Sequence, residues 1–164
     1  MDLTTSLIGF AVILICVVPI IVINQNTKKY AKLLLTKMEE LAEKHQSTIT
    51  RHDQWNNAAI GMDEKTGHVF FIAKEKNNEN LQCINLSDVI ECRVLQVARS
   101  NGANRLIEKL SLGFVFTDKY KSEVALEFYN SSTGSMTLSG ELQLVEKWCT
   151  VINRHLAVFA QQKK

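Results

Sequence analysis

Proline is almost missing from this chain, and so is every composition that marks a flexible linker. Pro19 is the only proline among 164 residues. No stretch is rich in glycine, proline or serine, and neither an internal repeat nor a low-complexity tract occurs. Beyond an N-terminal apolar segment and the helix that follows it, about 110 residues remain, which is enough for one domain with its own core.

Cysteine is scarce and has no pattern. One of the four, Cys16, lies in an apolar run, which leaves Cys83, Cys92 and Cys149. An odd number without C-x-x-C spacing is not typical of a disulfide framework or a zinc site. In a compartment that keeps thiols reduced, we interpret these three as small hydrophobic core residues.

Signatures of catalysis are absent as well. The sequence has no G-x-S-x-G nucleophile elbow, no Walker loop and no G-x-G-x-x-G fingerprint. The histidines fall on different predicted elements and lack the spacing of metal ligands: His45, His52, His68 and His155. We therefore predict no catalytic, cofactor-binding or metal-binding residue, and a protein that is not an enzyme.

Neither sign of charge dominates the chain beyond residue 54, where thirteen Lys and Arg face twelve Asp and Glu. A nucleic-acid surface needs a clustered basic face, so nucleic acid is not an expected partner. One basic cluster does occur, nearer the N-terminus and without an acidic residue inside it: Lys28, Lys29, Lys32 and Lys37.

A long apolar run precedes these lysines. Leu7 to Ile23 is seventeen residues without a charge, which as a helix covers roughly 26 Å of a hydrocarbon core about 30 Å thick. We predict a transmembrane anchor over residues 1–26. A signal peptide is one alternative, but only Asp2 is charged before the run and no A-x-A site follows it. A buried core helix is another, although such a helix is rarely apolar on every face.

The lysine cluster predicts the orientation of the anchor. No Lys or Arg precedes the run, so the positive-inside rule places the N-terminus outside and the C-terminal domain in the cytoplasm of a single-pass membrane protein. We assign Lys28, Lys29, Lys32 and Lys37 to the membrane interface, where anionic headgroups attract them. Solvated lysines that only stop translocation explain the same pattern.

Residues 27–53 are predicted to form a juxtamembrane segment, helical to about Thr48. Its apolar residues recur at three and four over about two heptads: Ala31, Leu34, Met38 and Leu41. A sustained coiled coil needs more repeats. A weak homodimer through this seam and a spacer helix that packs on its own domain or membrane surface therefore both stay open.

Residues 54–164 are predicted to form the soluble domain, of α+β class with six or seven antiparallel strands. Apolar and polar residues alternate over six stretches: 58–62, 68–74, 81–86, 89–99, 110–116 and 124–129. Asp63 to Gly67 reads as a turn. In the fourth stretch the apolar role passes from Val94 to Leu95, which predicts a bulge there, because a one-residue shift moves side chains to the other face.

A C-terminal helix is predicted from about Gly140 to Ala160. Its apolar stripe has the helical period and contains Trp148, which we expect in the core rather than at a partner surface. Ser139 is the expected N-cap, and Glu141 suits the positive end of the helix dipole. The helix has one face to bury, and the sheet offers the surface to receive it.

One short loop has recognition chemistry. Arg99, Asn101, Asn104 and Arg105 surround Gly102, and guanidinium and amide groups can hold a phosphate, a carboxylate or a partner. An ordinary solvated hairpin loop has the same composition, so both interpretations stay open.

Antiparallel strands followed by one amphipathic helix with a central Trp resemble a pleckstrin-homology-like (PH-like) domain, as found after a single membrane helix in small bacterial proteins. The resemblance covers roughly residues 54–160. It is carried by Ala59–Lys65 leading into Val69–Ile72, by Ile84–Val89 and by the Trp148 helix. It implies a bent, partly open barrel closed by that helix.

The resemblance does not by itself supply a function, since this scaffold binds lipid headgroups, peptides or proteins. Headgroup-binding members carry several Lys and Arg on the first hairpin, whereas the turn from Asp63 to Gly67 has two acids and one base. We expect a membrane-anchored cytoplasmic binding or scaffold module with a protein partner. The alternatives are a peripheral sensor of anionic lipid headgroups and an accessory subunit of a larger membrane complex.

Overall fold

The computed structural model of the chain describes residues 29–75, 78–101, 104–133 and 138–162. The predicted anchor, residues 1–26, and Lys28 lie outside these residues. No helix among the described residues has both the length and the apolar character needed to cross a membrane. The chain divides into two units, residues 1–37 and 38–164, and all that follows on packing concerns the second.

The predicted juxtamembrane helix is present over residues 29–44. Within the second unit, Met38 and Ala42 are buried. Met38 packs where Gly61 has no side chain: a Cβ on Gly61 would lie 2.9 Å from Met38 Cε. The close approach therefore depends on glycine at this position.

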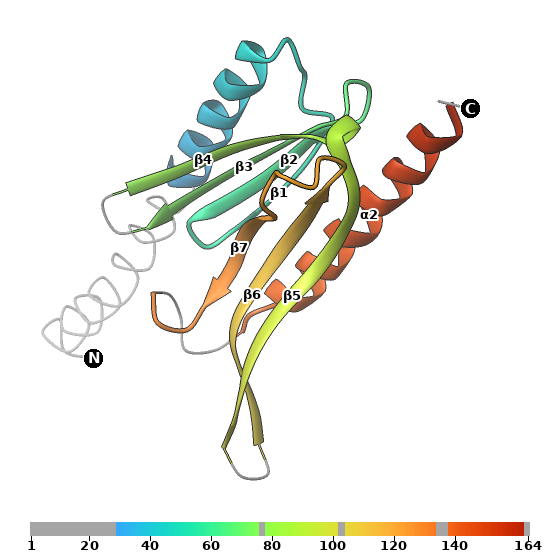
Figure 1. The fold of residues 1–164 in the computed structure, drawn as a ribbon. Helices are drawn as coiled ribbons and strands as arrows, with labels where there is room; N and C mark the ends of the chain where they lie inside the picture. The colour runs from blue at the N-terminus through green and yellow to red at the C-terminus, as the bar shows by residue number, and fades with distance from the viewer. Residues whose placement is uncertain (1–28, 76–77, 102–103, 134–137, 163–164) are drawn as a thin grey trace, which may run out of the picture. The chain divides into compact units, whose positions relative to one another are not determined.

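Four antiparallel strands form the first sheet, in the order β1 (Arg51–Trp55), β2 (Ala58–Asp63), β3 (His68–Glu75) and β4 (Asn78–Asn85) (Figure 1). β2 is buried along its whole length, because Ile60 and Met62 enter the core and Gly61 faces Met38. β1 was missed by the sequence analysis, since most of its side chains are exposed and no apolar alternation marks it.

The turn between β2 and β3 is held by a buried carboxylate. Asp63 Oδ2 accepts a hydrogen bond of 2.8 Å from Thr48 N, and Oδ1 accepts one of 2.8 Å from Lys65 N and one of 3.3 Å from Thr66 N. Burial alone would raise the pKa of Asp63, but these hydrogen bonds together outweigh it and lower the pKa. Gly67 closes the turn at φ +71°, which confirms the predicted turn.

Three antiparallel strands form the second sheet, in the order β5 (Val89–Asn101), β6 (Asn104–Phe116) and β7 (Val124–Asn130). A short 3-10 helix, η1 (Leu86–Asp88), joins the two sheets. β5 and β6 are longer than predicted. β7 pairs with β6 only from Lys109 to Phe114, so the far end of the β5–β6 hairpin is a two-stranded arm (Figure 1).

The bulge predicted at Val94–Leu95 is not there. The register with β6 shifts instead between Val89 and Glu91 and between Val97 and Ala98. Leu95 pairs with Ser111 and lies on the outer face of the sheet without a phase shift, where its side chain packs over the neighbouring Gly113. A Cβ on Gly113 would lie 2.8 Å from Leu95 Cδ1.

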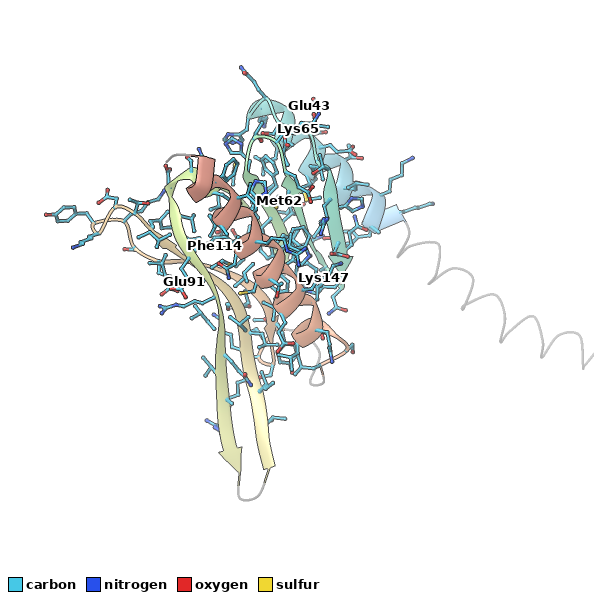
Figure 2. The ribbon with its side chains drawn as sticks, turned by 90° about the vertical axis from the view of Figure 1, so that its right-hand side faces the viewer. Glu43, Met62, Lys65, Glu91, Phe114 and Lys147 are labelled. Carbon is cyan, nitrogen blue, oxygen red and sulfur yellow. The ribbon has the colours of Figure 1, made fainter. Side chains whose placement is uncertain are left out.

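The helix α2 (Glu141–Gln162) covers the core between the two sheets (Figure 2). Val145, Trp148 and Ile152 are fully buried. Trp148 Nε1 donates a hydrogen bond of 2.9 Å to Asp53 Oδ2, which also accepts 2.7 Å from Lys147 Nζ. The prediction that Trp148 lies in the core is confirmed.

The prediction of an α+β domain with six or seven antiparallel strands and a C-terminal helix is confirmed, with seven strands observed, and this architecture is loosely compatible with a PH-like fold. The predicted partly open barrel is not: among the described strands, none of one sheet is hydrogen-bonded as a neighbour to a strand of the other. The sheets meet through side chains. Trp55 stacks on Phe128 with ring centroids 4.4 Å apart and donates 2.9 Å to its carbonyl.

Candidate binding groove

A recess runs between the end of β4, the η1 corner and the loop from β6 to β7. It consists of two adjoining cavities of about 540 and 420 Å³ that share Asp88, Phe116 and Lys121. We call the pair the η1 groove. Its other lining residues are Ser87, Thr117 and Asp118 on one side and His45, His68, Gln82, Cys83, Ile84, Asn85 and Val124 on the other.

The corner at η1 is built from local hydrogen bonds. Asn85 Oδ1 accepts 3.0 Å from Ser87 N, and Ser87 Oγ donates 3.3 Å to Asp88 Oδ1. Thr117 N donates 2.8 Å to the Asp88 carbonyl, which links the corner to the end of β6. Buried Leu86 holds the corner against the core. The sequence analysis assigned no role to this corner.

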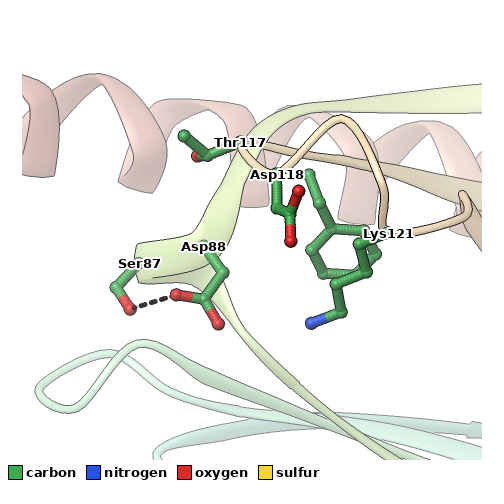
Figure 3. Close-up of a pocket in the computed structure, with 6 residues that line it drawn as sticks. Ser87, Asp88, Thr117, Asp118 and Lys121 are labelled. Carbon is green, nitrogen blue, oxygen red and sulfur yellow. Dashed lines mark hydrogen bonds between the residues drawn. The ribbon is translucent and has the colours of Figure 1, made fainter.

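The loop from β6 to β7 forms the opposite wall. Asp118 Oδ1 accepts 2.9 Å from Tyr120 N, and the Asp118 carbonyl accepts 3.1 Å from Lys121 N. Lys121 Nζ lies 3.9 Å from the centre of the Phe116 ring, a cation–π contact. Figure 3 shows the Asp88 carboxylate and the Lys121 ammonium projecting into the same space from opposite sides.

Tyr120 belongs to the loop from β6 to β7 that forms this wall; it does not itself line the groove and is 98% exposed. Lys119 and Lys121 flank it in the sequence. The sequence analysis missed this residue; a tyrosine between two lysines in a polar turn was the signal that would have pointed to it. A fully exposed aromatic side chain has no role in the fold, so its chemistry is available for recognition.

Two histidines that are 23 positions apart in the sequence meet at the far end of the groove. The rings of His45 and His68 have centroids 5.9 Å apart. Ser47 Oγ lies 2.9 Å from Thr66 Oγ1 and 3.2 Å from His68 Nδ1. Ser47 is buried, so this hydroxyl is not a nucleophile within reach of a substrate; the cluster fixes the His68 ring at the groove wall.

The assignment of the lysine cluster to a membrane interface remains a prediction. Lys29 and Lys32 are exposed on the helix over residues 29–44, Lys37 is half-buried on it, and Lys28 is outside the described residues.

The predicted recognition loop lies at the tip of the β5–β6 arm. Arg99 is 3.2 Å from Glu108, so its guanidinium has an acidic partner within the hairpin.

Asn101 and Asn104 pair across the same tip, and the side chains of Asn101, Asn104 and Arg105 are outside the described set. Arg99, whose side chain is described, does not line the η1 groove.

Part of the predicted dimer seam lies in the second unit, where Met38 is buried and Leu41 is half-buried. Ala31 and Leu34 belong to the first unit. Because Met38 packs against β2, it is not free to face a second copy in this conformation.

Side chains of α2 cover the edge of β5. Cys92 N donates 3.0 Å to Asn153 Oδ1, and Asn153 Nδ2 donates 2.6 Å to the Cys92 carbonyl. Cys149 Sγ donates 3.3 Å to that carbonyl as well. We call this the Asn153 clasp. Burial raises the pKa of both thiols, Cys92 and Cys149, which keeps them protonated. Cys92 lies in the core as predicted.

The described residues contain no group of three or more His, Cys, Asp or Glu placed to hold a metal ion. Comparison of the chain with models of known protein families, with curated proteins and with solved structures gave no match. The groove is therefore interpreted from its own chemistry.

Proposed function

We propose that this protein is a membrane-anchored scaffold whose PH-like cytoplasmic domain binds a segment of a partner protein in the η1 groove. The observation that carries the proposal is the mixed lining of the groove. Phe116, Ile84 and Val124 supply apolar surface beside hydroxyl, amide and charged groups. A few placed polar groups on an apolar base are what a binding site needs to fix the orientation of its ligand.

Tyr120 favours a protein as the ligand. Tyrosine is enriched in protein interfaces, where it buries a large ring and keeps a hydrogen-bonding tip. Asp88 and Asp118 add two negative charges to the groove beside Lys121, and these carboxylates would repel the phosphates of a lipid headgroup. The apolar run from Leu7 to Ile23 and the lysines after it support the membrane tether and its orientation.

The test is affinity capture from native membranes with the full chain and two variants. Tyr120→Ala should lose the partner, because it removes an exposed ring from the loop that forms one wall of the groove. Leu106→Ala is the matched control, since Leu106 is 57% exposed on the arm, and it should retain the partner. A partner kept by Tyr120→Ala would rule out the groove as its site.

A sensor of anionic lipid headgroups is the second candidate, favoured by Lys119 and Lys121 on either side of Tyr120. The full chain in lipid nanodiscs separates the two. Amide hydrogen exchange in residues 117–123 should be equal in neutral and anionic discs if the groove serves a protein. Slower exchange in anionic discs only would assign the loop to the membrane. A partner that is retained by every groove variant would instead fit an accessory subunit held through its anchor or helix.

A further inference from the structure

The described part of the fold has four edge strands, and β4 is the least protected of them. β5 is covered by the Asn153 clasp. β1 has only five residues, among them Arg51 and Asp53. β7 has a register shift opposite Leu110 and Ser111. β4 pairs with β3 over eight consecutive residues without a shift.

β4 also lacks the residues that normally guard an edge. Its sequence, NENLQCIN, has no proline, lysine or arginine, and Glu79 is its single charge. Leu81 is 46% exposed on it. A regular edge strand presents unpaired N–H and C=O groups, and without charges, proline or bulges it is a template for another strand.

The two ends of the β4 edge carry opposite charges, so that two antiparallel copies of the strand would be complementary. Glu79 lies near the start of β4. Lys121 and His68 lie beside its end, where they share a cavity with Gln82–Asn85. An antiparallel pairing of two identical strands brings the start of each against the end of the other. Each Glu79 would then approach the partner copy's basic end.

From these observations we propose that two copies of this chain associate through β4, side by side and antiparallel about a two-fold axis, so that the two four-stranded sheets become one. The contact is isologous, with the same strand on both sides. Main-chain hydrogen bonds, the two exposed Leu81 side chains and two pairs of Glu79 with the partner copy's Lys121 hold it. The proposal does not rest on what binds the η1 groove, although the β4 contact shares Lys121 and the end of β4 with that groove.

The expected dimer is weak. Eight paired residues bury less surface than a standard interface of about 1,600 Å², and the association is therefore expected in the micromolar range or above. Anchoring of both copies in one membrane would raise their effective concentration.

The test measures the mass of the full chain in non-ionic detergent micelles by light scattering over a concentration series. The wild type should change from monomer to dimer. Leu81→Lys should weaken the dimer roughly tenfold or more in Kd by placing like charges at the new seam. Leu106→Lys is the matched control: it puts the same charge on an exposed leucine of the β5–β6 arm, outside β4, and should leave the Kd unchanged.

A charge reversal tests the geometry. Glu79→Lys and Lys121→Glu should each weaken the dimer, and the double variant should regain most of the affinity, since each new charge then meets its opposite on the other copy. Thermal melting of each variant confirms that it is folded. A chain that stays monomeric throughout the concentration series overturns the proposal. So does a dimer that Leu81→Lys leaves intact, because it would then form through another surface, such as the seam of Ala31 and Leu41.

Discussion

The edges of β4 and β5 satisfy their main-chain groups in different ways. At β5, Asn153 supplies both an acceptor and a donor to Cys92, as a neighbouring strand would. At β4, the described residues place no such side chain on the strand, and Leu81 is half exposed. A helix that supplies hydrogen bonds to a strand closes that edge to other chains. The difference directs any strand pairing with another molecule to β4.

The two sheets also depend on different parts of the molecule for their stability. Closure of the β5 edge requires α2 to be in place, so the edge and the helix should be lost together. The four-stranded sheet has its own fastening at Asp63, which joins the β2–β3 turn to Thr48. Substitutions at these positions should therefore change the free energy of unfolding by different amounts, in an order that the contacts predict.

The largest effect is expected from Trp148→Ala. This side chain of α2 is fully buried, and its removal leaves a cavity and takes away one of the two hydrogen bonds of Asp53 Oδ2, at a cost of about 3 to 5 kcal/mol in the free energy of unfolding. Denaturant titration measures it. Trp148→Phe, which keeps most of the ring, should lose less. An unchanged midpoint for Trp148→Ala would contradict the core assignment.

Asn153→Ala should follow. It leaves the Cys92 N–H without its partner and weakens the contacts of the carbonyl, which costs about 2 kcal/mol for buried main-chain groups. Thr150→Ala, on the exposed side of the same helix, is the control and should change stability by less than about 0.5 kcal/mol. Equal effects of the two substitutions would mean that the clasp contributes nothing to stability.

A smaller effect, and one that depends on pH, is expected from Asp63→Asn. The folded pKa of Asp63 lies below its unfolded value, so the carboxylate stabilises the fold above the unfolded pKa and this contribution is lost as pH falls through the folded pKa. At neutral pH the loss should be about 1 to 2 kcal/mol. Acid unfolding of the variant should show a weaker pH dependence than the wild type, and superimposable acid profiles would refute this.

Gln82→Ala should have the smallest effect. It removes an amide from the β4 edge, as Asn153→Ala does from the β5 edge, but Gln82 Nε2 bonds only to the exposed Asn80 Oδ1 at 3.0 Å. We expect a change within about 0.5 kcal/mol. The measurement belongs at low protein concentration, where association does not add to stability. A loss as large as that of Asn153→Ala would show that β4 is held by contacts other than those described.

Most of the fold was predictable because the alternation of apolar and polar residues identifies its strands. The stretches 68–74 and 124–129 lie within β3 and β7, and the helix expected over 140–160 is observed as α2 over 141–162. β1 was missed because Arg51 to Trp55 carries polar side chains on both faces. The bulge was misplaced because alternation records which residues are apolar, and cannot show that Leu95 is covered by packing over Gly113.

The groove could not be predicted from the sequence in the same way. Its walls come from residues that are far apart in the chain, such as His45, Cys83 and Lys121, and no local spacing connects them. The Asn153 clasp is equally non-local, since Asn153 and Cys92 are on different elements. Only the corner at Ser87 and Asp88 gave a local signal, through residues that favour turns.

Because of the two-stranded arm, the main-chain hydrogen bonds at the two ends of β5 should open at different rates. Beyond Ala98 and Ile107, β5 and β6 pair only with each other, and an isolated pair of strands is marginally stable in water. Amide hydrogens in that part exchange with solvent whenever the hairpin opens locally, whereas those near Cys92 exchange only when α2 is released. The outer end of the hairpin can therefore refold around a contact while the core beneath α2 stays closed.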